Sequence, residues 1–200
     1  MRMARIWCLL AVAVSLLIDT SNSLAVELQM LEVDTKDGTF EIRADSLLSA
    51  SPAFIYAILL DYDNFHRLAG GISETRFLPP DEQGTLMGYT RIDSCVWFFC
   101  RKIERIERIF TIPGQEISTV AIPQRSDFEV YRTRWVIEPA GPGSTRLHFE
   151  ATMKPDFWIP PLIGPWAIRR KLQRTAERVG TRIEYLYANG LSITALPEYQ

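Results

Sequence analysis

The last third of the chain shows the clearest pattern of apolar and polar positions. Between Arg146 and Lys154 every second residue is apolar, which predicts a strand with one buried face. A loop rich in Pro and Trp follows at 155–166, and apolar residues then recur at helical spacing until a helix end near Gly190. The pattern predicts a long amphipathic helix packed on a sheet, an arrangement that commonly encloses an apolar cavity.

Shorter segments upstream also have strand or helix character and are separated by turn residues. Residues 26–33 and 39–44 flank a turn at Asp37-Gly38, and the second segment either continues the first strand or forms its hairpin partner. Ser51-Pro52 begins a short apolar helix, and a second short helix ends at Gly70-Gly71. Six further strands are predicted at 72–78, 85–94, 99–110, 116–122, 128–138 and 145–154.

Segment 103–109 does not fit a simple strand pattern. Isoleucine recurs there at every third position, which suits a helix better than a strand. The neighbouring segments favour a strand, and we expect a bulge that shifts its alternation.

Two strands and the long helix supply the residues that we expect to face the cavity. One face of the last strand is apolar throughout. In 128–138 both faces contain apolar and polar residues, and we expect the face with Tyr131 and Trp135 to point inward. The residues predicted to bind a ligand are Tyr131, Thr133, Trp135, Phe149, Ala151, Met153, Leu172, Val179 and Ile183.

The N-terminus has the features of a secretory signal peptide. Arg2 and Arg5 precede an apolar run at 6–18, which is too short to span a membrane, and Ser23-Leu24-Ala25 offers a cleavage site. We expect cleavage after residue 25, one domain at 26–192, a tail at 193–200 and a periplasmic location after export across the inner membrane. The alternative is an uncleaved membrane anchor.

The charge balance of the mature chain argues against nucleic-acid binding. The full chain has 22 basic and 24 acidic residues, and removal of 1–25 takes away two basic residues and one acidic residue, which leaves a net charge of −3. A nucleic-acid-binding domain would usually be clearly basic.

The cysteines that remain after cleavage are Cys95 and Cys100. A pair in an oxidising compartment is usually a disulfide, and these residues would face each other across a four-residue hairpin connection. Two inert buried thiols are the alternative. A metal site is not expected, because these cysteines and the distant His66 and His148 do not form a ligand set.

The loop before the long helix offers a candidate surface for transient membrane contact. Its apolar residues crowd a Pro-rich stretch beside a row of arginines on the helix at positions 170, 174, 178 and 182. Such a combination suits an anionic bilayer. The alternatives are an ordinary solvated helix face and a lid over the cavity mouth. The predicted membrane-contact residues are Phe157, Trp158, Ile159, Leu162 and Trp166.

Two stretches resemble a known superfamily. Residues 50–65, from Ala50-Ser51-Pro52 to Asp63-Asn64-Phe65, and the segment 134–139 followed by 143–147 are similar to motifs of the START-like / polyketide cyclase (SRPBCC) superfamily, closest to its coenzyme Q-binding START-type proteins. The resemblance implies an α+β helix-grip fold: a curved antiparallel sheet of six or seven strands wrapped on the C-terminal helix, with two short helices after the first strand. It implies no universal catalytic residue, and the signal peptide departs from its mostly intracellular relatives.

Three functions are compatible with these features. The first is a carrier of a hydrophobic small molecule in the cell envelope, such as a quinone, an isoprenoid or another lipid, without a cofactor. The second is an enzyme of the cyclase or dehydratase kind, for which Tyr131, Arg105, Glu107 and either Tyr56 or Tyr89 are acid–base candidates with no spacing that fixes a mechanism. The third is an interaction module with a filled interior. The sequence favours the carrier, assigns no catalytic residue and leaves the oligomeric state open.

Overall fold

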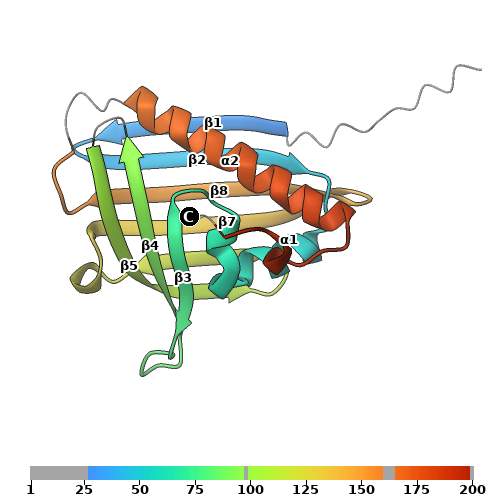
Figure 1. The fold of residues 1–200 in the computed structure, drawn as a ribbon, viewed down its shortest axis with the longest axis horizontal. Coiled ribbons are helices and arrows are strands. Elements are labelled where there is room, and N and C mark those ends of the chain that lie inside the picture. The colour runs from blue at the N-terminus through green and yellow to red at the C-terminus, as the bar shows by residue number, and fades with distance from the viewer. Residues whose placement is uncertain (1–26, 97–98, 160–164, 199–200) are drawn as a thin grey trace, which may run out of the picture.

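The computed structural model describes residues 27–96, 99–159 and 165–198. They form one antiparallel sheet of eight strands with a long helix lying across it (Figure 1). The predicted signal peptide at 1–25 and Leu162 lie outside the described residues. The strands are β1 (Glu27–Lys36), β2 (Thr39–Leu48), β3 (Ile72–Leu78), β4 (Leu86–Val96), β5 (Phe99–Ile112), β6 (Glu116–Ala121), β7 (Phe128–Gly141) and β8 (Ser144–Pro155).

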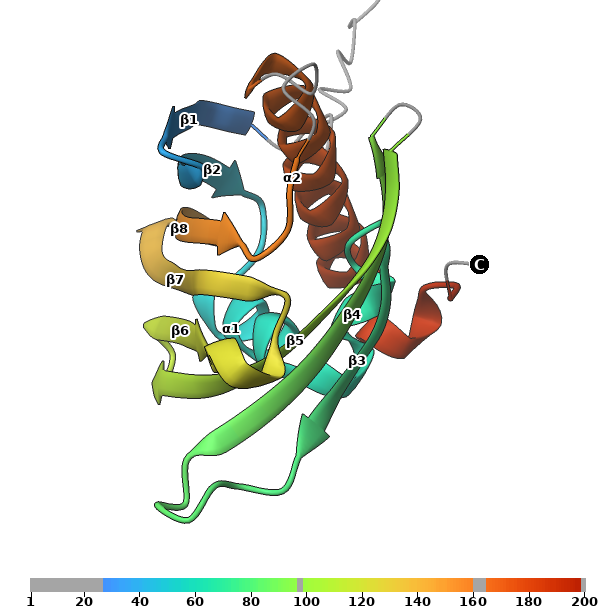
Figure 2. The same cartoon turned by 90° about the vertical axis from the view of Figure 1, so that its left-hand side faces the viewer.

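The strand order is β1-β2-β8-β7-β6-β5-β4-β3, so the last strand pairs with the second. Viewed along the sheet, the strands curve around the long helix α2 (Pro165–Ala188), with β1 and β2 on one side and β3 and β4 on the other (Figure 2). This arrangement confirms the predicted α+β helix-grip class. No helix among the described residues has the length and apolar character needed to cross a bilayer.

The predicted strand count is corrected from six or seven to eight, because the N-terminal segment forms two full strands. Asp37 and Gly38 both have positive φ, 51° and 76°, and they join β1 and β2 in a hairpin. The hairpin alternative for residues 39–44 is therefore the right one. The two short helices follow the second strand rather than the first.

The bulge expected within 103–109 is absent from β5. Its register with β4 is unbroken from Leu86↔Ile109 to Val96↔Phe99. The three-residue isoleucine period arises because Ile103 and Ile109 lie on the inner face whereas Ile106 lies on the outer one.

The short helices close one end of the sheet. α1 (Pro52–Leu60) begins where the Ser51 hydroxyl accepts a hydrogen bond from Phe54 N at 3.4 Å. The 3₁₀ helix η1 (Tyr62–Arg67) follows, and Asp63 Oδ1 accepts from Phe77 N at 2.7 Å, which ties η1 to β3.

The C-terminal half of α2 is fixed in the core. Ile183 and Leu186 have no exposed surface, and Glu184 Oε1 accepts a hydrogen bond from Ser49 N at 2.7 Å. The 3₁₀ helix η3 (Ile193–Ala195) packs against the same core through Ile193. The solid core therefore lies at the end of the molecule that holds α1. The N-terminal half of α2 lies over another part of the sheet.

Candidate functional site

A cavity of about 420 Å³ lies between the inner face of the sheet and α2. Its size falls within the range of small-molecule sites, and most of its lining side chains are apolar. The β2 strand contributes Phe40, Ile42 and Ala44, and the β5 strand contributes Ile103 and Ile109, alongside the residues of β7, β8 and α2.

The structure brings eight of the nine predicted ligand-binding residues to this cavity. These are Tyr131, Thr133, Trp135, Phe149, Met153, Leu172, Val179 and Ile183. Ala151 is buried on the same face of β8 but does not reach the lining. Their contact with a ligand stays a prediction. The β2 residues were missed, although the alternation at 39–44 marks Phe40 and Ile42 as one buried face.

The inner face of β5 shows where the cavity opens. Arg101, Ile103, Arg105, Glu107 and Ile109 all line it. Arg101 is exposed and Ile103 is half-buried, whereas the side chains from Arg105 onward are buried. The mouth therefore lies at the Arg101 end of the strand.

A buried ion pair occupies the interior of this otherwise apolar space. Arg105 and Glu107 are 7% and 1% exposed, and both lie on the inner face of β5. Arg105 Nη2 donates to Glu107 Oε1 at 3.0 Å. Arg105 Nε lies 2.9 Å from Glu107 Oε2, and this contact is an ion pair whose geometry falls short of a hydrogen bond.

Hydroxyl groups from neighbouring elements complete the cluster. The Tyr62 hydroxyl donates to Glu107 Oε1 and lies 2.6 Å from Thr90 Oγ1. Gly88 makes room for Tyr62, since a Cβ at position 88 would come within 2.6 Å of the ring. The Arg105 guanidinium stacks 3.9 Å from the ring centroid of Tyr131. Tyr131, Arg105 and Glu107 were candidates from the sequence, but Tyr62 and Thr90 were not.

The environment keeps both tyrosines protonated. Burial raises the pKa of Tyr62 far above its ordinary value, and Glu107 raises it further. Burial also raises the pKa of Tyr131, although Arg105 opposes this shift. Burial alone would lower the pKa of Arg105, but Glu107 and the two tyrosines outweigh it, so the pKa lies above its ordinary value and the guanidinium stays charged.

The other acid–base candidates lie outside the cavity. The Tyr89 hydroxyl donates to Glu104 Oε1 at 2.9 Å on the exposed side of the sheet, and Tyr56 packs against the core from α1. His148 on β8 pairs with Asp45, which lies opposite it on β2. Within residues 27–96, 99–159 and 165–198 no group of acidic, His and Cys side chains has the arrangement of a metal site.

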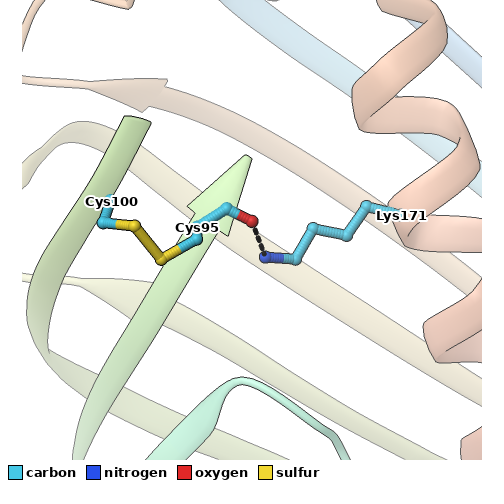
Figure 3. The surroundings of a disulfide bond; sticks show 3 residues. All are labelled: Cys95, Cys100 and Lys171. Carbon is cyan, nitrogen blue, oxygen red and sulfur yellow. Dashed lines mark hydrogen bonds between the residues drawn. A yellow bond between two sulfur atoms is a disulfide. The ribbon is translucent and has the colours of Figure 1, made fainter. Parts of the chain in front are cut away.

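The cavity mouth is bordered by the β4–β5 hairpin, the segment after β8 and the first turns of α2. The predicted disulfide between Cys95 and Cys100 is confirmed, with the two sulfurs 2.02 Å apart across the hairpin. Figure 3 shows Lys171 reaching from α2 to this hairpin, where Nζ donates to Cys95 O at 3.5 Å. Burial lowers the pKa of Lys171.

The predicted membrane-contact residues separate into two groups at this mouth. Phe157 and Ile159 are half-buried and line the cavity, and the Arg101 guanidinium lies 4.5 Å from the Phe157 ring centroid. Trp158 and Trp166 are 71% and 68% exposed. Phe157 and Ile159 therefore fit the interpretation of this loop as a lid over the cavity mouth. Trp158 and Trp166 remain exposed at the surface.

The row of arginines on α2 also divides. Arg170 and Arg174 are exposed near the mouth. Arg182 donates to the carbonyl oxygens of Arg67 and Leu68 at 2.7 and 3.0 Å, and so helps to hold α2 to η1. Arg170 and Arg174 are therefore exposed to solvent, whereas Arg182 is held against η1.

Comparison with known proteins agrees with this geometry. Residues 48–179 match the model of a family described as "Polyketide cyclase / dehydrase and lipid transport". No curated protein shows significant similarity to the chain.

Solved structures show the same fold at low sequence identity. A START superfamily protein from Mycobacterium smegmatis is 20% identical over 74% of this chain and 97% of its own, with a TM-score of 0.56. A STAR-related lipid transfer protein from Xanthomonas axonopodis is 14% identical over 76% and 98%, with a TM-score of 0.55. The Zhui aromatase/cyclase from a Streptomyces species is 12% identical over 76% and 93%, with a TM-score of 0.52.

Proposed function

The chain belongs to the polyketide cyclase / dehydrase and lipid transport family, and on this premise we propose that it binds and carries a hydrophobic small molecule in its cavity. The observation that carries the proposal is the 420 Å³ space lined mainly by apolar side chains. Each CH₂ group that a ligand buries there contributes about 0.8 kcal/mol, so an alkyl or isoprenoid tail binds without extensive polar recognition. A quinone, an isoprenoid or another lipid has the required chemistry.

The proposed place of action is the cell envelope. Two features support it: the signal-peptide pattern at the N-terminus and the disulfide between Cys95 and Cys100, since disulfides persist in oxidising compartments. Fractionation of cells that express the full chain tests this location, and recovery of uncleaved protein in the cytoplasm would contradict it.

Filling the cavity is expected to remove the bound molecule. Ala176 lines the cavity from α2, and an Ala176→Trp variant places an indole in the space that the tail would occupy. Mass spectrometry of organic extracts from natively purified protein should then find about tenfold less co-purified lipid than in the wild type.

The matched control is Ala188→Trp, which makes the same change at an exposed position at the end of α2. It should retain the wild-type amount of lipid. Equal lipid in both variants, or none in the wild type, would count against the carrier function.

We also propose that Trp158 and Trp166 insert into an anionic bilayer when the ligand is exchanged. Both are exposed, and Arg169, Arg170 and Arg174 lie exposed on the first turns of the adjoining helix. This juxtaposition places aromatic groups and positive charge beside the cavity mouth.

A Trp158→Ala, Trp166→Ala double variant is expected to partition into phosphatidylglycerol vesicles more than about tenfold less than the wild type. Co-sedimentation at low salt measures the difference. The control Tyr185→Ala removes an aromatic ring that is 50% exposed, farther along α2, and should bind as the wild type does. Unchanged sedimentation of the double variant would remove the docking proposal.

Catalysis is the second candidate, and the cluster of Arg105, Glu107, Tyr62 and Tyr131 is the observation in its favour. A cyclase or dehydratase needs a group that exchanges protons near neutral pH. The two tyrosines have raised pKa values and Arg105 stays charged, so none of these three is suited to act as a base. Recovery of bound ligand with altered mass after incubation would favour the enzyme over the carrier.

A further inference from the structure

The mouth of the cavity carries two positively charged side chains. Arg101 extends from β5 and Lys171 extends from α2, and both side chains line the cavity. We propose that these two cations bind the anionic head group, a carboxylate or a phosphate, of an amphiphile whose tail fills the cavity. The inference rests on the proposed function, because it names the class of molecule that the cavity takes.

The fold brings the two cations to one corner of the mouth. Arg101 on β5 pairs across the ladder with Ser94 on β4, and Cys95 is the next residue of that strand. Lys171 reaches from α2 to this point, where its Nζ donates to the Cys95 carbonyl oxygen at 3.5 Å (Figure 3). A head group at this corner would lie close to both side chains.

The positive charge at the mouth is not balanced by an acidic side chain of the lining. Among the described residues that line the cavity, Glu107 alone is acidic, and it lies six residues farther along β5 in an ion pair with Arg105. Arg101 stacks on the Phe157 ring and forms no ion pair within the described ranges. The excess positive charge of the lining therefore lies at the mouth.

The surroundings of Lys171 give an anion a reason to bind there. Its side chain is half-buried, and burial lowers the pKa of the ammonium group. A carboxylate or phosphate beside the ammonium group would favour its charged form and raise the pKa again. Arg101 keeps its charge in any case, because arginine is not deprotonated in proteins. The mouth therefore favours an anionic group over a cationic one.

The position of the two cations sets the orientation of the ligand. Beyond the mouth the lining is mainly apolar, from Ile103 on β5 to Leu172 and Val179 on α2. An ionised group that is buried without a partner in such surroundings costs a large free energy. The head group would therefore stay at the mouth, in contact with water and the two cations, while the tail enters the cavity.

Four probes of equal chain length test the head group: decanoate, decyl phosphate, decanol and decylammonium. Each displaces the uncharged dye Nile red from the wild-type protein at neutral pH and low salt. The two anions are expected to bind about tenfold more tightly than decylammonium, because the cations attract the first two and repel the third. The chain as a whole has a net charge of −2, so its overall charge favours the opposite order. The tighter of the two anions identifies the head group as carboxylate or phosphate.

An Arg101→Met, Lys171→Met double variant should lose the preference for anions and bind decanol as the wild type does. Its affinity for decanol thereby shows that the cavity is intact. The matched control is Lys102→Met, which removes a positive charge from the next residue of β5, where the side chain is exposed and does not line the cavity. This variant should keep the preference.

A fifth probe, decanedioate, tests the orientation. Its second carboxylate would have to enter the apolar interior, so it should bind about tenfold less tightly than decanoate.

The outcomes separate the head-group site from the carrier function. Equal affinity for the anions and decylammonium, a preference that survives in the double variant, or equal affinity for decanedioate and decanoate would overturn the head-group site and leave the hydrophobic carrier standing. Failure of all probes to displace the dye would contradict the carrier itself. The wild-type series decides the question even when the double variant does not fold.

Discussion

A Glu107→Leu substitution should lower the free energy of unfolding by about 3–5 kcal/mol, the largest effect that we expect from one residue. The substitution leaves the Arg105 guanidinium buried without its counter-charge, and the Tyr62 hydroxyl loses an acceptor. Arg105 cannot relieve the cost by releasing its proton, because arginine stays protonated in proteins. Urea unfolding followed by circular dichroism measures the loss.

Two controls isolate the buried charge as the cause. The Arg105→Met, Glu107→Leu double variant removes both charges and should recover most of the lost stability. Glu129→Leu breaks a solvent-accessible ion pair with Lys154 between β7 and β8 and should cost less than about 1 kcal/mol. A double variant as unstable as the single one would show that packing, and not charge, sets the loss.

The second large effect is expected at the helix end that is fixed in the core. Leu186→Ala should destabilise the protein by about 2–5 kcal/mol, because its side chain has no exposed surface and joins α2 to the core cluster beside Ile183 and Ile193. Thermal unfolding monitored by calorimetry gives the difference.

The neighbouring Tyr185 provides the matched control. It lies one residue earlier on the same helix but is 50% exposed, so Tyr185→Ala should change stability by no more than about 0.5 kcal/mol. Similar losses for the two variants would mean that α2 is not held by the buried face described above.

The fold could be predicted from sequence wherever one face of an element is apolar throughout. The β8 strand has such a face, and its residues Phe149 and Met153 reach the cavity as expected. The long helix was predicted for the same reason, since its buried positions recur at helical spacing.

The β5 strand shows why part of the site could not be predicted. Arg105 and Glu107 were acid–base candidates from the sequence, but the pattern of apolar and polar residues gave no sign that they form an ion pair with each other inside the cavity. Their partners come from distant segments: Tyr62 is 45 residues from Glu107 along the chain. Only the tertiary structure brings these groups together.

The short helices lie between these two cases. Their existence followed from the Ser51-Pro52 start and the glycines at the end, and the structure confirms the Ser51 cap. The contact of Asp63 with β3, fourteen residues away, depends on the path by which the chain returns to the sheet. No local sequence pattern indicates this contact.

The sheet is open and does not close into a barrel, and this affects which ligands the cavity can accept. Among the described residues, the edge strand β1 pairs only with β2 and the edge strand β3 pairs only with β4. The helix α2 lies between these two edges of the sheet (Figure 2). Paired strands keep a fixed spacing of about 4.8 Å, but side chains on a helix can shift without breaking a ladder hydrogen bond. A wider ligand would be accommodated by displacement of the N-terminal half of α2, which lies outside the solid core. The protein should therefore discriminate only weakly among ligands by their width.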